Sequence, residues 1–399
     1  MTERPLPLDG LRVLDFGHTV MGPTAGLVLA DLGAEVIRVE PASGDPTRKL
    51  KGFGTGYFPF YNRNKRSVSI DLKDARGLEV ARRLIATADV LIENFGPGTM
   101  HRLGLGYDQI AAACPKLVYL SLKGFLPGPY EHRVALDEVV QMMSGLAYMT
   151  GPPGQPLRAG ASVIDVMGGV MGVVAVQAAL AERERTGKGQ FVTSALFESA
   201  MFLMGQHLAY AALSGEPVPP MPARVSAWAI YDQFDAADGA RVFLGITSDR
   251  HWVRFCDLFR APDLADDPTL ATNNQRIAAR ERLLPQVARI VARHDADTLA
   301  RMAEEAKLPF ARIARPEELF DDPHLLAGGR LLDTELPGGV ETRLPALPVE
   351  LDGRRTRLTR DPPAAGADTR SVMEELGLPA AEIDALIAGG VLVDGGEAA

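Results

Sequence analysis

The first 122 residues alternate short apolar runs with segments of helical spacing, and this alternation limits the possible folds more than any other feature. Runs rich in strand-forming residues lie at 11–16, 34–40, 67–72, 89–95 and 117–122. Segments with helical periodicity lie between them, at 23–33, at 75–88 and near 107–113. A strand, a helix and a strand within about 30 residues form a βαβ unit, whose parallel strands need helical cover. We therefore predict a Rossmann-like α/β domain.

The pattern changes after a proline-rich stretch at 214–225. Beyond it, a strand-like run at 240–247 and polar amphipathic segments at 275–293 and 297–306 indicate a smaller α+β domain. Residues 343–370 read as extended connectors, and a final helix at 369–377 is expected to pack on the first domain. The predicted organisation is a large domain over 1–213, a linker over 214–225, a small domain over 226–328, a second linker over 329–350, and a segment over 351–399 that returns to the large domain.

The most apolar segment, ASVIDVMGGVMGVVAVQAAL at 161–180, contains one charged residue, Asp165. The segment is long enough to raise the alternative of a membrane span. Asp165, Gln177 and three glycines favour a core helix of the large domain instead. Because burial of an unpaired carboxylate is costly, Asp165 either caps this helix or takes part in chemistry.

The charge and the cysteine content narrow the choice of partners and of compartment. The chain has 399 residues, a formal net charge of −9 and a pI of about 5.4, which argues against a protein that coats nucleic acid or an anionic membrane surface. Cys114 and Cys256 form neither a disulfide framework nor a metal-ligand spacing. The amino-terminal residues show no apolar stretch typical of a secretory signal. We therefore expect a cytoplasmic protein without a metal site and without a nucleic-acid or membrane partner.

Several common catalytic and nucleotide-binding motifs do not match the sequence. The first turn has glycines at 17, 22 and 26, which is neither the dinucleotide pattern G-x-G-x-x-G nor a P-loop. RTGKGQ at 185–190 is best interpreted as a helix C-cap and turn. The seven histidines form no zinc motif, and no G-x-S-x-G elbow is present. Carboxylate chemistry, cations for phosphates and glycine-rich turns remain.

Several segments, in this order, resemble the family III CoA-transferases, a group that includes formyl-CoA transferase, the carnitine CoA-transferases and α-methylacyl-CoA racemase. These segments include VLDFGHTVMGPTAGLVLADLGAEVIRVE, NRNKRSVSIDLK, ADVLIENFGPG, ASVIDVMGG and ERERTGKGQFV. The resemblance covers nearly the whole chain. It implies an interlocked homodimer of two ring-shaped subunits, each with a Rossmann-like large domain and a small domain.

The resemblance assigns the catalytic role to Asp165. In such transferases an aspartate at this position attacks an acyl-CoA thioester, which gives an acyl-aspartyl anhydride and then an aspartyl-CoA thioester. Gly168 and Gly169 are expected to allow the substrate to approach the start of the helix closely. Coenzyme A enters as the acyl-CoA substrate, and no permanently bound cofactor is expected.

The resemblance also implies contacts to CoA along the loops that follow strands. These residues are Thr19, Val20, Met21, Ile70, Asp71, Leu72, Lys73, Asn94, Phe95, Gly96, Arg102, Lys123, His132, Arg133 and Leu136. Cations among them suit the phosphates of CoA, and Phe95 suits its adenine or pantetheine. Three of them, Lys123, His132 and Arg133, are also candidate partners for a second carboxylate if the transferred acid is dicarboxylic.

Three departures from the family pattern bear on specificity. Val20 stands where formyl-CoA transferase has a glutamine, and Pro41 replaces an arginine. Leu136 stands where the racemase has a catalytic histidine, so two-base epimerisation is disfavoured. We therefore favour a CoA-transferase acting on a small carboxylic acid. An acyl-CoA racemase or isomerase remains the alternative, and a non-catalytic CoA-binding protein is a third. Asp137 and Glu138 lie near the site by analogy, with surface or helix-start roles equally open.

Overall fold

The computed structural model describes residues 5–223 and 227–395, which divide into two units. The first unit comprises the chain up to residue 222 together with residues 327 onward, and the second unit comprises residues 223–326.

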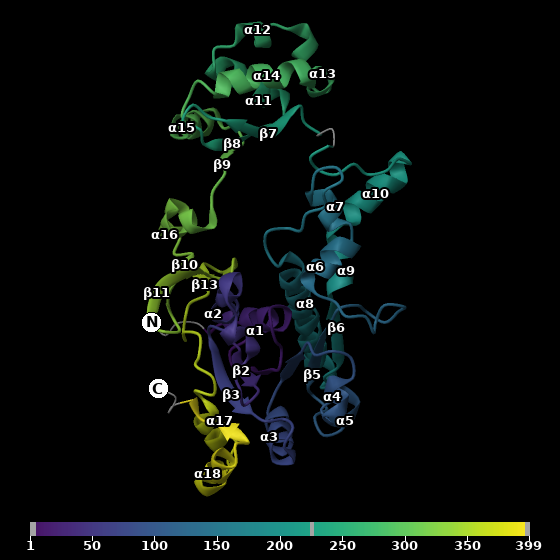
Figure 1. Cartoon of the computed structure of the whole chain (residues 1–399), viewed down its shortest axis with the longest axis vertical. Helices are drawn as coiled ribbons and strands as arrows, with labels where there is room; N and C mark the ends of the chain where they lie inside the picture. Colours follow the sequence, from purple (N-terminus) through teal and green to yellow (C-terminus); the bar gives the residue numbers. More distant parts are fainter. Residues whose placement is uncertain (1–4, 224–226, 396–399) are drawn as a thin grey trace. The chain divides into compact units, whose positions relative to one another are not determined.

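The first unit is built on a seven-stranded sheet with the order β14-β3-β2-β1-β4-β5-β6 (Figure 1). Its strands are β1 Arg12–Asp15, β2 Glu35–Glu40, β3 Lys65–Ile70, β4 Val90–Glu93, β5 Val118–Lys123, β6 Phe191–Ala195 and β14 Leu392–Val393. All neighbours pair in parallel except β14, which is antiparallel to β3. The five strands predicted in the first 122 residues are confirmed as β1 to β5, with ends displaced by one or two residues.

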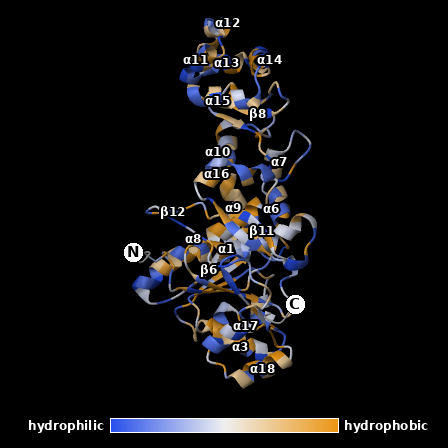
Figure 2. Ribbon diagram, turned by 90° about the vertical axis from the view of Figure 1, so that its left-hand side faces the viewer, coloured by the Kyte–Doolittle hydropathy of each residue, from blue (hydrophilic) through white to orange (hydrophobic). Residues whose placement is uncertain are grey.

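Helices cover both faces of this sheet, because the parallel strands present buried apolar residues on each side. One core contains residues of α3, α17 and α18, and the other contains residues of α1, α8 and α9. Figure 2 shows hydrophobic residues concentrated along the strands and on α9. The helices of the first unit are α1 Met21–Asp31, α2 Tyr57–Tyr61, α3 Ala75–Ile85, α4 Thr99–Arg102, α5 Tyr107–Ile110, α6 Asp137–Met143, α7 Leu146–Thr150, α8 Val163–Thr186, α9 Leu196–Leu203, α10 Gly205–Ser214, α17 Thr369–Glu375 and α18 Ala380–Ala388.

Helix α8 is long and apolar enough, by length and composition, to cross a membrane. In the structure it connects β5 to β6 and packs on α1 and on the sheet. A Cβ added at Gly172 would lie 2.8 Å from Leu122 Cδ2, so the glycine is needed for this close approach to β5. The helix ends at Gly187, whose φ of 70° and N–H bond to the Arg183 carbonyl confirm the predicted C-cap.

The second unit packs helices on a three-stranded antiparallel sheet formed by β7 Ile230–Asp235, β8 Arg241–Ile246 and β9 Phe310–Arg312. Its helices are α11 Asp249–Leu258, α12 Pro262–Ala265, α13 Asn273–Ala278, α14 Arg280–Val291 and α15 Ala296–Ala306, and α16 Pro323–Ala327 follows at the boundary. Arg276 is buried there because it donates to the carbonyls of Leu270 and Ala271 and lies over the Trp252 ring.

The segment expected to be a linker over 329–350 contains a β-hairpin, formed by β10 Leu331–Leu336 and β11 Val340–Pro345. Gly338 and Gly339 adopt φ of 87° and 76° in its turn, a conformation that glycine reaches without strain. The sequence signal for this hairpin was therefore its Pro-Gly-Gly turn at 337–339. A shorter two-stranded pair, β12 Glu350–Leu351 and β13 Arg354–Arg355, follows.

The NRNKRS motif at 62–67 ties the returning segment to the sheet. Asn64 Oδ1 accepts hydrogen bonds from the backbone N–H groups of Thr359 and Arg360. Ser67 Oγ accepts from the Gly366 N–H and donates to Glu40. The NRNKRS motif, one of those that carry the resemblance, therefore has a structural role.

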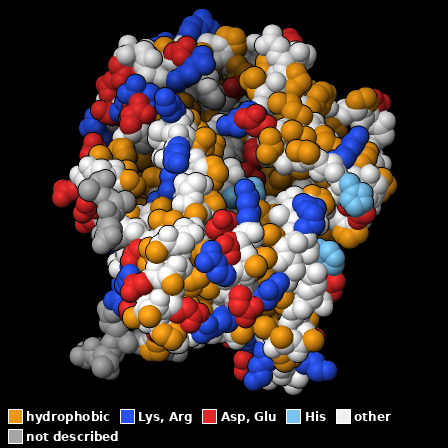
Figure 3. All heavy atoms as spheres, turned by 60° about the horizontal axis from the view of Figure 1, so that its bottom comes forward, with side chains coloured by type: hydrophobic (Ala, Val, Ile, Leu, Met, Phe, Trp, Pro, Cys, Tyr) orange, Lys and Arg blue, Asp and Glu red, His pale blue; other side chains and the backbone are white. Residues whose placement is uncertain are grey.

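On the face drawn in Figure 3, basic and acidic side chains are interspersed.

Candidate active site

The order of the strands places a topological switch point between the carboxyl ends of β1 and β4. The chain proceeds outward from β1 in one direction and from β4 in the other, and ligands of open α/β sheets bind at such a switch point. The two loops are joined there, because Asn94 Oδ1 accepts from the His18 N–H at 2.7 Å and Asn94 Nδ2 donates to the His18 carbonyl at 3.0 Å. The segments predicted to bind CoA at 19–21 and 94–96 thus lie together.

His18 belongs to the first of these two loops and was not among the predicted site residues. Its ring contacts Phe95, with centroids 5.6 Å apart, and Nδ1 lies 3.0 Å from Thr19 Oγ1. Burial and the neighbouring guanidinium of Arg38 lower the pKa of His18. Thr19 is exposed and adopts a φ of 65°, which is unusual for a β-branched residue. No motif in the sequence distinguishes His18 from the other histidines.

Buried ion pairs lie beneath the first turn. Lys65 Nζ donates to Asp15 Oδ2 at 2.8 Å, and Arg38 contacts both Asp15 and Asp45. Burial lowers the pKa of Lys65 to about 8 despite its carboxylate partner. Burial alone would raise the pKa of Asp15, but Lys65 and Arg38 outweigh it and lower that pKa. Asp15 in turn accepts from the Gly17 N–H at 2.8 Å, so the network fixes the turn.

The helix that carries Asp165 meets the first turn through its glycines. A Cβ at Gly168 would lie 2.5 Å from Met21 Cε, and one at Gly169 would lie 2.6 Å from the Met21 carbonyl oxygen. The expectation that these glycines leave room for a substrate is therefore wrong, because α1 fills that space. The close packing instead places Met21 against residues of α8 that lie about one helical turn after Asp165.

The start of α8 is capped by a residue from another helix. Ser162 occupies the N-cap position without a side-chain hydrogen bond, and Asp165 lies within the first turn. Asp137, the first residue of α6, accepts from the N–H groups of Ile164 at 2.8 Å and Asp165 at 3.1 Å. Gln141 Nε2 donates to Asp137 at 2.5 Å and so holds the capping carboxylate in place. Asp137 therefore caps this helix, which is the role that the sequence left open for Asp165.

The Asp165 carboxyl group is partly buried, and the described ranges, 5–223 and 227–395, provide it with no hydrogen-bond donor. Burial, together with the nearby carboxylate of Asp137, raises its pKa to about 7. Burial also raises the pKa of Tyr61 to about 12, with a contribution from the charge of Asp165. The sequence did not indicate Tyr61, which ends α2. Asp165 therefore carries a weakly solvated carboxyl group with a pKa of about 7, beside the carboxylate of Asp137.

The remaining residues predicted to bind CoA differ in their burial and in their position along the sheet. The side chains of Val20, Met21 and Ile70 are buried, so only their backbone atoms can meet a ligand. Residues 71–73 follow β3, two strands away from β1 in the sheet. The Arg102 guanidinium donates to the Pro97 carbonyl and to Thr99 Oγ1.

The cations expected further along the chain have partners of their own. Lys123 Nζ donates to Glu93 Oε1 at 3.1 Å. His132 lies 3.1 Å from Glu131, and the Arg133 guanidinium lies 4.4 Å from the centre of the Tyr130 ring. The Leu136 side chain is 62% exposed, directly before the buried Asp137. Within the described part of the chain, these contacts do not bring the three cations to Asp165.

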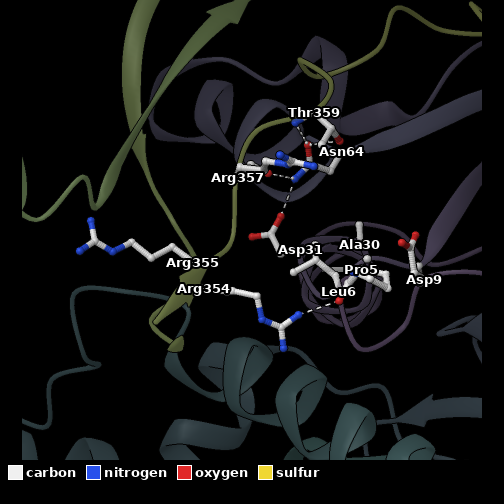
Figure 4. Close-up of a pocket in the computed structure, with 12 residues that line it drawn as sticks. Pro5, Leu6, Asp9, Ala30, Asp31, Asn64, Arg354, Arg355, Arg357 and Thr359 are labelled. Atoms are coloured by element: carbon white, nitrogen blue, oxygen red, sulfur yellow. Dashed lines mark hydrogen bonds between the residues drawn. The ribbon is translucent and has the colours of Figure 1, made fainter. Parts of the chain in front are cut away.

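A cavity of about 510 Å³ lies at the opposite, amino edge of the sheet (Figure 4). It is bounded by the end of α1 at Asp31 and by Asn64, just before β3. Figure 4 shows Arg354 directed toward the Pro5 carbonyl, with Arg355 turned away from it. None of the predicted site residues lines this cavity. The carboxyl edge, not this cavity, is therefore the candidate active site.

Comparisons with known proteins agree over most of the chain. The sequence profile described as CoA-transferase family III matches residues 8–369. A succinate–glutarate CoA-transferase of Agrobacterium fabrum is 34% identical over 390 residues, covering 94% of this chain and 97% of that protein. A succinyl-CoA:mesaconate CoA-transferase of Haloarcula hispanica is 34% identical, covering 90% and 92%. The crystal structure of a CaiB/BaiF family protein from Brucella suis has a TM-score of 0.83 and 32% identity, covering 94% and 100%. The similarity thus spans both units.

Proposed function

The chain belongs to CoA-transferase family III, and we propose that it moves CoA from an acyl-CoA donor to a small carboxylic acid with Asp165 as nucleophile. The proposal rests on the observation that Asp137 and Asp165 have different roles at the start of α8. Asp137 caps the helix, and within residues 5–223 and 227–395 no backbone N–H donates to the Asp165 carboxylate, which burial desolvates. A carboxylate that is not held by strong donors is a better nucleophile than a solvated one.

The proposed reaction consists of four substitutions at carbonyl carbons. An Asp165 oxygen attacks the thioester carbon, the C–S bond breaks, and the CoA thiolate leaves an acyl-aspartyl anhydride. The thiolate then attacks the aspartyl carbon, the C–O bond breaks, and the donor acid departs as a carboxylate. The acceptor carboxylate attacks the resulting aspartyl thioester and expels the thiolate. The thiolate finally attacks the acceptor carbonyl and regenerates the Asp165 carboxylate, so no proton is consumed overall.

In this proposal CoA lies in the crevice at the switch point and is a substrate, with no permanently bound cofactor. Two contacts support this proposal: Asn94 joins the loops at 19–21 and 94–96 through His18, and Met21 packs against Gly168 and Gly169 of the helix that carries Asp165. Phe95 is partly buried and offers an aromatic face to the ligand. We propose a cytoplasmic location for the enzyme, as the cysteine content suggests.

We also propose that the chain functions as an interlocked homodimer of ring-shaped subunits. Exposed apolar side chains on α6, α7, α9 and α10 support an extensive interface. They include Val139, Met142, Met143, Tyr148, Phe202, Leu203, Leu208, Tyr210 and Leu213. Single exposed apolar residues are ordinary, but a concentration of this size is typical of an interaction site. Light scattering after gel filtration is expected to give twice the chain mass of 42.8 kDa.

The function is tested by incubating the purified chain with succinyl-CoA and glutarate and separating the CoA esters by chromatography. Glutaryl-CoA is expected with the wild type and not with Asp165→Asn. Hydroxylamine added during turnover is expected to convert the activated Asp165 side chain into a hydroxamate, detectable by mass spectrometry of the peptide. Glu184→Gln, an exposed substitution at the far end of α8, is the matched control and retains activity.

Two outcomes would overturn the proposal. One is near-native CoA exchange by Asp165→Asn. The other is exchange of the α-proton of an acyl-CoA in heavy water without CoA transfer to any of a panel of acids, which would support the racemase or isomerase alternative.

A further inference from the structure

Arg158 is a cation that the hydrogen-bond network holds close to the start of α8. The N–H of the next residue, Ala159, donates to Gln141 Oε1 at 2.8 Å. The same glutamine donates to Asp137, and Asp137 accepts from the Asp165 N–H at 3.1 Å. The backbone next to Arg158 is therefore connected to the backbone of Asp165 through two side chains and three hydrogen bonds, and Arg158 precedes Asp165 by seven residues in the chain.

The charges around this point are unbalanced. Asp137, Glu138 and Asp165 contribute three carboxylates, and the Arg158 guanidinium ion-pairs with Glu138 across the first turn of α6. Both partners reach solvent, with side chains 31% and 62% exposed. An exposed ion pair of this kind contributes little to stability. The Arg158 guanidinium can therefore leave Glu138 and pair with the carboxylate of a ligand at little cost in free energy. The planar guanidinium presents several donors in a geometry that suits a carboxylate.

Building on the proposed function, we propose that Arg158 determines specificity by binding the distal carboxylate of a dicarboxylic acid whose proximal carboxyl group reacts at Asp165. A dicarboxylic acid brings two negative charges to a site where Asp165 is an uncharged CoA thioester at that stage and the carboxylates of Asp137 and Glu138 remain. Without a cation, the distal carboxylate of the acid would be repelled by the neighbouring carboxylates and would also lose its hydration. Lys123, His132 and Arg133, the cations expected from the sequence, contact Glu93, Glu131 and Tyr130, whereas the partner of Arg158 is Glu138, which directly follows the capping residue Asp137.

The test compares two acceptors of equal chain length, glutarate and pentanoate, with one fixed acyl-CoA donor. The readout is the ratio of the two kcat/KM values, because any effect of a substitution on the donor or on the fold cancels in that ratio. Arg158→Gln is expected to lower the ratio about tenfold or more, through a higher KM for glutarate. Arg158→Lys keeps the charge without the planar fork and is expected to give an intermediate ratio.

Two further variants sharpen the test. Glu138→Gln removes the competing carboxylate, so the KM for glutarate is expected to fall while that for pentanoate stays constant. Arg185→Gln, which changes an exposed arginine in the last turn of α8, is the charge-matched control and leaves the ratio unchanged. If Arg158 only holds the loop before α8, both acceptors lose activity equally and the ratio does not move.

The outcomes separate this inference from the proposed function. If the wild type transfers CoA but Arg158→Gln leaves the ratio unchanged, the inference is overturned and the proposed function stands. A wild-type ratio near one, with no preference for glutarate, also overturns it. If the wild type transfers CoA to no acid, the proposed function fails and this inference fails with it.

Discussion

Replacing Asp165 by asparagine is expected to abolish activity and, at the same time, to stabilise the fold. The folded chain raises the pKa of Asp165 from 3.8 to about 7, through burial and through the carboxylate of Asp137. At about 1.4 kcal/mol per pKa unit, this shift corresponds to a cost of about 4 kcal/mol for keeping Asp165 ionised in the folded state. Asparagine carries no charge, but its amide also needs partners, so we expect a gain of about 2–4 kcal/mol.

The free energy of unfolding depends on pH because the folded chain holds the Asp165 proton more tightly than the unfolded chain does. Between about pH 4 and pH 7 the folded chain binds more protons at Asp165 than the unfolded chain does. The free energy of unfolding of the wild type therefore falls as the pH rises through this window, and the cost is fully present above the folded pKa. The stability difference between Asp165→Asn and the wild type is accordingly near zero at pH 4 and largest at pH 8.

The assay is urea unfolding followed by far-UV circular dichroism at fixed protein concentration, at pH 5 and at pH 8. Tryptophan fluorescence monitors the second unit in the same samples, because both tryptophans, Trp228 and Trp252, lie there. Glu184→Gln is the control for removal of one exposed carboxylate from α8 and is expected to shift stability equally at both pH values. An Asp165→Asn variant that is no more stable than the wild type at pH 8 would refute the idea that this carboxylate is held desolvated.

Three other substitutions test the surroundings of Asp165. Asp137→Asn removes a neighbouring charge, so the pH profile of kcat/KM for CoA transfer is expected to move to lower pH, whereas an unchanged profile would contradict the electrostatic coupling. Gly169→Ala places a Cβ 2.6 Å from the Met21 carbonyl and is expected to lower stability by about 1–3 kcal/mol, compared with Gly205→Ala, whose Cβ meets nothing within 4 Å. Asn94→Ala loses both bonds to His18 and is expected to raise the KM for acyl-CoA about tenfold with a smaller change in kcat; an unchanged KM would argue against CoA in this crevice.

Much of the sheet could be predicted because its signals are local. Strands β1 to β5 each form a short apolar run between turn residues, and α1 and α3 have clear helical spacing. The β10–β11 hairpin was missed because polar residues make up half of its two strands, without strict alternation with apolar ones, although its Pro-Gly-Gly turn was visible. The helix start at Val163 and the end at Gly187 agree with the apolar run and with the glycine that follows it.

The candidate site was harder to predict because its parts come from distant segments. Asp165 was identified from a resemblance, and the proximity of 19–21 and 94–96 agrees with the order of the strands. His18 and Tyr61 carry no local signal, since a lone histidine and a lone tyrosine are common in any sequence. The role of Gly169 was misread because the sequence does not show that Met21 of α1 occupies the space beside it.

The choice between a capping and a catalytic role for Asp165 shows why local rules could not decide. An acidic residue in the first turn of an apolar helix satisfies the rule for helix starts whether or not its side chain meets the backbone. What decides is Asp137, which lies 28 residues earlier in the chain and reaches the same N–H groups. Its carboxylate stabilises the helix start and raises the pKa of Asp165 at once. One side chain therefore supplies the fold with its cap and leaves the second carboxylate available for chemistry, at the cost in stability that Asp165→Asn would recover.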